Sequence, residues 1–242
     1  MSIVNTLTLE SNRQIKINFD GGDLSSDAGL LLIKEFAAKI GFTKLVKQKF
    51  KTNDKSVRFH KDAENLLQMI YQVISAYFQD DCADELTLDP VFQAILGKES
   101  LASQPTLSRF FNRMDEDTLV QFDDIDKNLR DIIYSIKCPE HVLLDLDSTL
   151  LGTYGRQEGE GFNFHYQAHG YHPLLCYDGL TGDLLKAELR NGTLHCSNGA
   201  DKFMESIFQE YMERGLKTYL RGDSGFSSPK LYETCESNGC SY

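Results

Sequence analysis

The stretch LLDLDSTLLGTYG (residues 143–155) begins as a hydrophobic run with two acids in alternation and then breaks into hydroxyl-bearing residues and glycines. Successive side chains of a strand point to opposite faces, so Asp145 and Asp147 share one face and Leu144 and Leu146 the other. The pattern therefore predicts a buried strand over residues 141–147 that brings two carboxylates to one face near its end.

The sequence that follows keeps a period of two and is typical of further strands. We predict strands over 164–177 and 184–190, joined by the turn DGLTGD (178–183), which makes an antiparallel meander with the first strand. A helix centred on 203–211, a strand over 217–221 and a last helix over 229–237 complete the series. The order β-β-β-α-β-α is that of a ribonuclease-H-like domain, a mixed sheet with helices on its faces, without its final strand and helix.

The first half of the chain has a different pattern. Residues 7–19 alternate and predict a strand or hairpin, followed by turn residues over 19–29. Apolar spacing of 3.6 predicts helices over 30–40, 66–78 and 119–136, with a short helix within 101–114. We place a domain boundary after residue 139, which gives a mainly helical region (1–139), a ribonuclease-H-like region (140–242) and a mixed α/β fold class.

Composition limits the class of protein. The 242 residues are 41% hydrophobic, and their apolar runs are shorter than the roughly 18 residues of a membrane span. The first residues do not resemble a secretion signal, and the six cysteines form no CxxC pair. We therefore expect a soluble cytoplasmic protein with reduced thiols and no membrane partner.

Charge is unevenly distributed along an acidic chain. The formal net charge is −11, yet residues 44–61 hold seven basic residues against one acid. That stretch could bind DNA or be an ordinary solvated face. Nearby, Ser103 is a candidate helix cap before Arg109 and Arg113. Their helix could be the second of a helix-turn-helix pair that binds DNA, or a plain connector.

Two chemistries fit the acids of the first strand. The letters of Asp145, Asp147 and Thr149 match the DxDxT motif of haloacid-dehalogenase-like phosphatases, in which the first acid attacks phosphorus. That class requires a parallel sheet, a later lysine and a second acidic motif, and GDSGFSSP (222–229) supplies no second acid. Alternatively, Asp147 and Asp223 lie at the ends of neighbouring strands, where they could hold two Mg²⁺ ions for attack on a phosphodiester.

Several strings carry a resemblance that covers nearly the whole chain. They are DLDST (145–149), QEG with FNFHY (157–166), YHPLLCYDGLTGDLL (171–185), LRNGTLHCSNGA (189–200), LRGDSGF (220–226), FDGGDLSSDAGLLL (19–32) and LASQPTLSRFFNR (101–113). They resemble the DDE transposases of bacterial insertion sequences, in the branch called transposase DDE domain group 1.

The resemblance implies a ribonuclease-H-like catalytic domain, Mg²⁺ dependence, recognition of terminal inverted repeats and cut-and-paste transfer into target DNA. By motif position, Asp147 is the first metal-binding acid and Asp223 the second, while Asp145 has a supporting or structural role. An intact enzyme of this kind is expected to form a homo-oligomer.

The sequence departs from the family at its third acid, usually a glutamate well beyond the second. Only 19 residues follow Asp223, and Glu233 and Glu236 come too early for that position. We therefore expect a truncated chain with a poor metal site and weak or no activity. A decayed element is the favoured explanation, beside a fragment of a longer enzyme and a short product that still binds element ends without catalysis.

Several other polar and aromatic residues have two possible roles each. His165, His169 and His172 resemble metal ligands, but structural or DNA-facing roles fit a strand of period two better. Arg190 and Arg221 end strands beside the acids, where they could hold the scissile phosphate or form ordinary ion pairs. The aromatic residues near 154–166 could stack on unpaired bases, although core packing is favoured.

Overall fold

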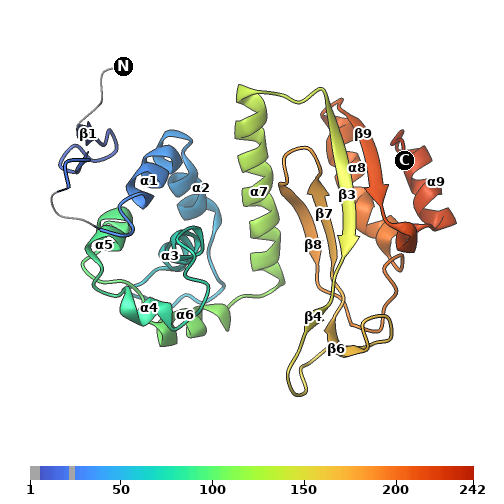
Figure 1. Ribbon diagram of the computed structural model, residues 1–242, viewed down its shortest axis with the longest axis horizontal. Helices are drawn as coiled ribbons and strands as arrows, with labels where there is room; N and C mark the ends of the chain where they lie inside the picture. Colours follow the sequence, from blue (N-terminus) through green and yellow to red (C-terminus); the bar gives the residue numbers. More distant parts are fainter. Residues whose placement is uncertain (1–5, 22–24) are drawn as a thin grey trace. The chain divides into compact units, whose positions relative to one another are not determined.

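The computed structural model describes residues 6–21 and 25–242, so residues 22–24 of the turn predicted over 19–29 lie outside it (Figure 1). The chain divides into two compact units, the first ending at Ile132 and the second spanning Ile133–Tyr242. This division falls inside the long helix α7 (Glu116–Ile136), ahead of the boundary predicted after residue 139. The mixed α/β class is confirmed.

The first unit is a helical bundle preceded by a small hairpin. Strands β1 (Thr6–Thr8) and β2 (Lys16–Asn18) pair antiparallel. Of the strand or hairpin predicted over residues 7–19, the structure has the hairpin. The helices that follow are α1 (Leu30–Lys39), α2 (Phe42–Lys49), α3 (Asp62–Ile74), α4 (Cys82–Glu85), α5 (Pro90–Leu96), α6 (Gln104–Phe111) and α7.

Local sequence signals explain the helix ends in this unit. The Asp89 carboxylate accepts the N–H groups of Val91 and Phe92, each at 2.9 Å, and Pro90 occupies the first helical position of α5. Ser103 occupies the cap position of α6, but its hydroxyl pairs with the Thr106 hydroxyl instead of a backbone N–H. Residues 97–103 separate α5 from α6, which is longer than the tight turn of a helix-turn-helix pair. Of the two alternatives for this helix, a connector therefore agrees better with the structure than the second helix of a helix-turn-helix pair.

The second unit is built on a four-stranded sheet with the order β8-β7-β3-β9. Strand β3 (His141–Ser148) pairs antiparallel with β7 (Leu174–Asp178), and β7 pairs antiparallel with β8 (Leu184–Glu188). Strand β9 (Lys217–Gly222) lies parallel to β3 on its other side. The meander and the parallel fourth strand are the predicted ribonuclease-H-like arrangement.

The strand predicted over 164–177 is two strands in two sheets. Its first half forms β6 (Ala168–Tyr171), which joins β4 (Leu151–Gly152) and β5 (Gly161–Asn163) in a small separate sheet. Its second half is β7. The break has a physical cause, because Pro173 lies between β6 and β7 and has no N–H to donate to a ladder.

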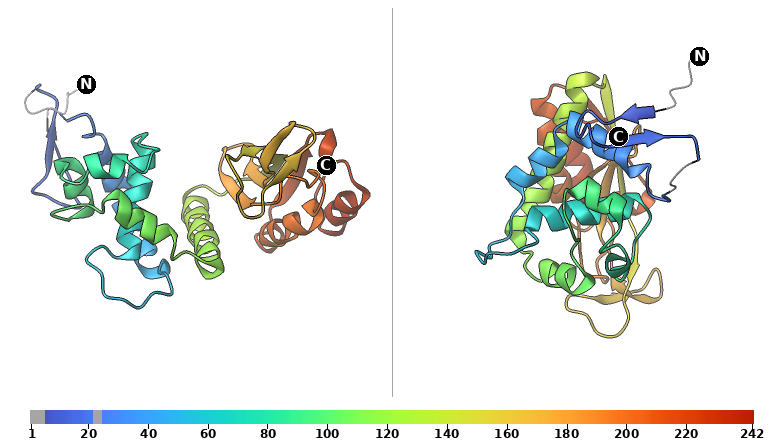
Figure 2. Two further views of the ribbon diagram at one scale, coloured as in Figure 1. Left: turned by 90° about the horizontal axis from the view of Figure 1, so that it is seen from below. Right: turned by 90° about the vertical axis from the view of Figure 1, so that its left-hand side faces the viewer.

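The core of this unit lies on one face of the main sheet. Val142, Leu144 and Leu146 of β3 are buried there against α8 (Ala200–Glu213) and α9 (Pro229–Ser237). The left view of Figure 2 shows these two helices beside one another along the sheet. Because side chains alternate along β3, the opposite face carries Asp145 and Asp147. The packing thus fixes which residues of β3 are available for chemistry.

Candidate active site

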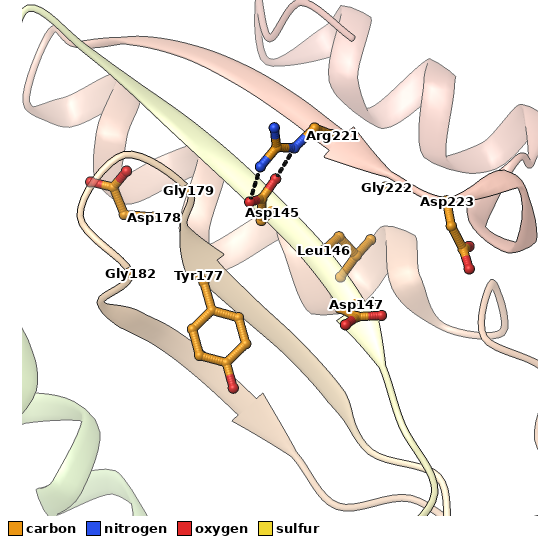
Figure 3. Close-up of a pocket in the computed structure, with 10 residues that line it drawn as sticks. All are labelled: Asp145, Leu146, Asp147, Tyr177, Asp178, Gly179, Gly182, Arg221, Gly222 and Asp223. Carbon is orange, nitrogen blue, oxygen red and sulfur yellow. Dashed lines mark hydrogen bonds and ion pairs between the residues drawn. The ribbon is translucent and has the colours of Figure 1, made fainter.

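Two acids meet where strands β3 and β9 end. The strands are parallel, and their register pairs Leu146 with Gly222, so Asp147 and Asp223 are the next residues along each strand. Both line a pocket of about 570 Å³ on the open face of the sheet, and Figure 3 shows both carboxylates at one end of it. The structure therefore brings together the two acids predicted from the sequence.

The backbone holds each of these carboxylates in place. Asp147 accepts the N–H of Ser148 at 2.7 Å. Asp223 caps the short 3₁₀ helix η1 (Ser224–Phe226) by accepting the N–H of Gly225 at 2.8 Å. Both residues are exposed, and within the described part of the chain neither lies within salt-bridge distance of a basic side chain. Their negative charge is therefore available to a cation.

Asp145 is held differently, although it lies on the same face of the same strand. It is in register with Arg221 of β9, and the Arg221 guanidinium donates from both Nε and Nη2 to the two oxygens of its carboxylate (Figure 3). The hydrogen bond and the charge of Asp145 raise the pKa of Arg221, whose side chain is 63% exposed. Two parallel N–H···O bonds fix the direction of the guanidinium plane. Asp145 thus positions an arginine beside the acid pair.

The end of β7 and the turn after it form the opposite wall of the pocket, where the sequence predicted only a strand end and a turn. Tyr177, Asp178 and Gly179 all line the pocket. A Cβ atom on Gly179 would lie 2.4 Å from Oδ2 of Asp145, so a larger residue there would have to displace the carboxylate that Arg221 binds. The sequence signal was present in DGLTGD, where Gly179 follows the buried Asp178.

The oxygen atoms of the acid pair match the ligands of a divalent metal ion. Magnesium prefers oxygen ligands and is commonly held by one or two carboxylates together with water and substrate phosphate. Asp147 and Asp223 supply two such carboxylates at neighbouring strand ends. Among residues 6–21 and 25–242, no three His, Cys, Asp or Glu side chains gather as a metal site. The acid pair fits Mg²⁺ as a two-carboxylate site.

Comparison with known proteins agrees with this geometry. Residues 7–242 match the family described as transposase DDE domain group 1. The chain belongs to that transposase family. A search of curated proteins found no match.

Solved transposase structures are similar to this family member over part of its length. The catalytic domain of Mos1 mariner transposase is 12% identical, with 53% of this chain and 60% of that chain covered and a TM-score of 0.31. A piggyBac transposase synaptic complex with hairpin DNA is 16% identical, with 83% and 45% covered and a TM-score of 0.37. The transposase-family chain thus spans about 60% and 45% of the lengths of these two proteins.

The phosphatase alternative does not agree with the structure of this transposase-family chain. The strands after β3 are antiparallel, whereas that alternative requires a parallel sheet. Its nucleophile would be Asp145, whose two oxygens are both bound by Arg221. The DxDxT letters therefore have another explanation, in which the first acid holds an arginine.

Arg190 is not available for DNA in this structure. Its side chain is 6% exposed, and Nε donates to the carbonyl of His172 at 3.0 Å. Nη1 donates to the carbonyl of Asn198. Burial lowers the pKa of Arg190. Its hydrogen bonds to backbone carbonyls connect the loop after β8 to the end of the strand. The sequence correctly placed Arg190 at the end of a strand, but the direct DNA contact predicted for it is replaced by this structural role.

The predicted histidines serve different purposes. His172 is buried between the Ser148 hydroxyl at 3.0 Å and the Leu194 carbonyl at 2.8 Å, which ties β3 to a loop. His169 pairs with Glu160 at 3.0 Å. His165 lines a separate pocket that also reaches Asp223. Structural roles therefore describe His169 and His172, as favoured from the sequence.

The two arginines predicted to bind DNA from α6 also differ from one another. Arg113, in the turn after α6, donates to Asp62 at 2.8 Å and to the Arg109 carbonyl at 2.9 Å, so it joins the end of α6 to the start of α3. Arg109 is exposed and contacts only the Thr106 hydroxyl, at 3.4 Å, among the described residues. In this transposase-family chain, Arg109 is accessible to an anion, whereas Arg113 forms a structural ion pair.

Across the described residues, no helix has the length and apolar character needed to cross a membrane.

Proposed function

We propose that this chain binds DNA of a mobile element and breaks and rejoins its phosphodiester bonds at Asp147 and Asp223. One observation carries the proposal: two exposed carboxylates that have no basic partner among the described residues lie at neighbouring parallel strand ends, in one pocket with an oriented arginine. Membership of the transposase family supports the reaction class. The same membership supports DNA and a divalent metal as partners.

The chain's own residues have separate tasks in this proposal. Asp147 and Asp223 hold the divalent ions. Bound Mg²⁺ supplies the positive charge that makes water or a 3′-hydroxyl nucleophilic and stabilises the leaving oxygen. Arg221 keeps Nη1 available beside the pocket, because Asp145 engages only Nε and Nη2. A phosphate oxygen can accept from that Nη1, which places the phosphodiester next to the acid pair. The new P–O bond forms to the nucleophile as the bond to the leaving strand breaks.

Replacing the acids one at a time tests this proposal. The full chain is incubated with labelled duplexes of the DNA that flanks its gene, with Mg²⁺ or Mn²⁺, and strand cleavage is measured. We expect Asp147→Asn and Asp223→Asn to lower cleavage by about a thousandfold, because each removes a charge that holds metal. Asp183→Asn is the control, since Asp183 is an exposed acid of the neighbouring turn that does not line the pocket.

The outcome separates an enzyme from a DNA-binding fragment. Cleavage that depends on Asp147 and Asp223 but not on Asp183 supports catalysis at this site. Cleavage that survives both substitutions would place the chemistry elsewhere. DNA binding without cleavage by the unsubstituted chain would favour the non-catalytic alternative.

A further inference from the structure

The first unit contains a small basic pocket that the acid pair does not use. Its volume is about 240 Å³, and the lining side chains come from the loop before α3, from α6 and from the turn after α6: Arg58, Phe59, His60, Thr106, Arg109 and Arg113. None of these six is an acid, although the whole chain has a formal net charge of −11. Three arginines around one hollow are the expected surroundings of an anion.

The arginines of this pocket differ in whether they form an ion pair with a carboxylate. Arg113 is held by Asp62, and its side chain is only 13% exposed, so it forms a fixed wall. Arg109 has no carboxylate within salt-bridge distance among the described residues and touches only Thr106. The positive charge of Arg109 is therefore free to meet an anion, with the Thr106 hydroxyl as a second donor.

Arg58 shares its charge with one carboxylate through a single contact. Its Nη2 donates to Asp54, and no other acceptor among the described residues engages its guanidinium. The pKa of Asp54 is lowered to about 2, chiefly by hydrogen bonds from Ser56 and to a smaller extent by Arg58. Because Ser56 already stabilises the carboxylate, Arg58 retains donors for a second anion.

An exposed aromatic ring borders the same pocket. Phe59 is 69% exposed, an unusual position for so large an apolar side chain. The Lys98 ammonium lies 4.9 Å from its ring centre, and the His60 ring packs edge-on at 4.8 Å. These contacts hold the ring at the rim of the basic pocket, where a sugar or base attached to a bound phosphate would find an apolar surface.

We propose that this pocket binds a backbone phosphate of the DNA, with Arg58 and Arg109 as its donors and Phe59 against the adjoining sugar or base. The inference rests on the proposed function, because it names where the first unit holds the DNA substrate. Phosphate contacts of this kind fix the position of a protein on a duplex without reading its sequence. The loop over residues 51–61 thus contributes to DNA binding together with α6, in place of the helix-turn-helix pair.

Salt dependence of DNA binding by the full chain measures this contact. Affinity for a fluorescein-labelled duplex is followed by anisotropy between 50 and 300 mM NaCl in EDTA, where cleavage cannot occur. Each lost phosphate contact is expected to reduce the slope of log K against log salt by about 0.9. Because both arginines contact the same phosphate, we expect this full reduction for the double variant and a smaller reduction for Arg109→Ala and for Arg58→Ala, in each of which the other arginine remains. Arg109→Ala is the cleaner test, because removal of Arg58 leaves Asp54 to repel DNA.

Two controls separate this contact from general charge and from misfolding. Arg13→Ala removes an exposed arginine of the same unit that does not line the pocket, and its slope is expected to stay unchanged. Arg109→Lys keeps the charge and most of the slope. Circular dichroism of each variant confirms the helical content. An unchanged slope in the double variant, with the fold intact, overturns the proposal.

Two further outcomes identify the ligand and the level at which an error lies. If the double variant loses binding of inorganic phosphate, measured by calorimetry, but keeps its DNA slope, the pocket holds a free anion and the DNA proposal fails. If the unsubstituted chain shows the arginine-dependent slope but does not cleave DNA, the proposed catalysis fails and the phosphate pocket stands.

Discussion

The two units of this chain carry pockets of opposite charge. The pocket of the second unit is lined by Asp145, Asp147, Asp178 and Asp223 with one arginine, and the pocket of the first unit by three arginines and a histidine with no acid. A DNA phosphate is repelled by the former and attracted by the latter. The acidic pocket therefore needs a cation before it can approach DNA, whereas the basic pocket does not.

Under the proposed function, this difference assigns DNA binding to the first unit and DNA cleavage to the second. Substitutions or conditions that affect one unit should leave the other activity measurable, since each unit has its own hydrophobic core. The net charge of −11 does not contradict DNA binding, because residues 44–61, which supply part of the basic pocket, hold seven basic residues against one acid. The predictions below test how complete the separation is.

Metal removal is expected to have the largest effect. Chelation by EDTA should abolish strand cleavage, because Asp147 and Asp223 repel the phosphate when no cation lies between them. DNA affinity in the same buffer is expected to change by less than about threefold, since the arginines of the first unit need no metal. Parallel cleavage and anisotropy measurements check both. A parallel loss of binding and cleavage in EDTA would show that the acidic pocket also holds the DNA.

Core substitutions test whether the units are independent in stability. Phe208 of α8 is 1% exposed, and Phe208→Ala is expected to cost about 3–5 kcal/mol. Hydrogen exchange followed by mass spectrometry should show faster exchange in peptides of residues 140–242, with peptides of residues 30–111 unchanged. Phe110→Ala, whose ring is fully buried in the first unit, is the matched variant and should show the reverse. Faster exchange throughout the chain would mean that the units unfold together.

Much of the second unit could be predicted from the sequence because its signals are local. Alternation places Leu144 and Asp145 on opposite faces of β3, and the structure confirms that placement. The strand over 164–177 was misjudged because Pro173 was included in it, whereas Pro173 separates β6 from β7 and the two strands pair in different sheets.

The sites were less predictable, because they depend on long-range pairing. Asp147 and Asp223 were selected together, but the ion pair of Asp145 with Arg221 requires the register of β3 against β9. Likewise, Arg190 is buried because it donates to loop carbonyls, and the sequence pattern does not predict these contacts. In the first unit, Arg58 and Arg109 converge only because the loop before α3 packs beside α6.

Substitution of Arg221, the arginine paired with Asp145 in the acidic pocket, is expected to have an intermediate effect on cleavage. Arg221→Lys keeps a positive charge but loses the planar fork that Asp145 fixes. We expect cleavage to fall about 10- to 100-fold, with anisotropy-measured DNA affinity nearly unchanged. Lys186→Arg, on β8 outside the pocket, is the control for a basic substitution in the same sheet. Wild-type cleavage by Arg221→Lys would remove this arginine from the proposed phosphate contact.

The smallest expected effect is on the pKa of Asp54, which shows how strongly Arg58 interacts with that carboxylate. The folded-state pKa of Asp54 is about 2, below its ordinary value of 3.8, so the stability contributed by the ionised carboxylate is complete above about pH 4 and is lost as pH falls toward 2. The hydroxyl of Ser56 is the largest cause. Ser56→Ala should therefore raise the pKa of Asp54 toward 3.8 more than Arg58→Ala does, as measured by carbon-detected NMR titration. The reverse order would mean that Arg58 is mainly committed to Asp54, and the basic pocket would then depend on Arg109 for its contact with DNA.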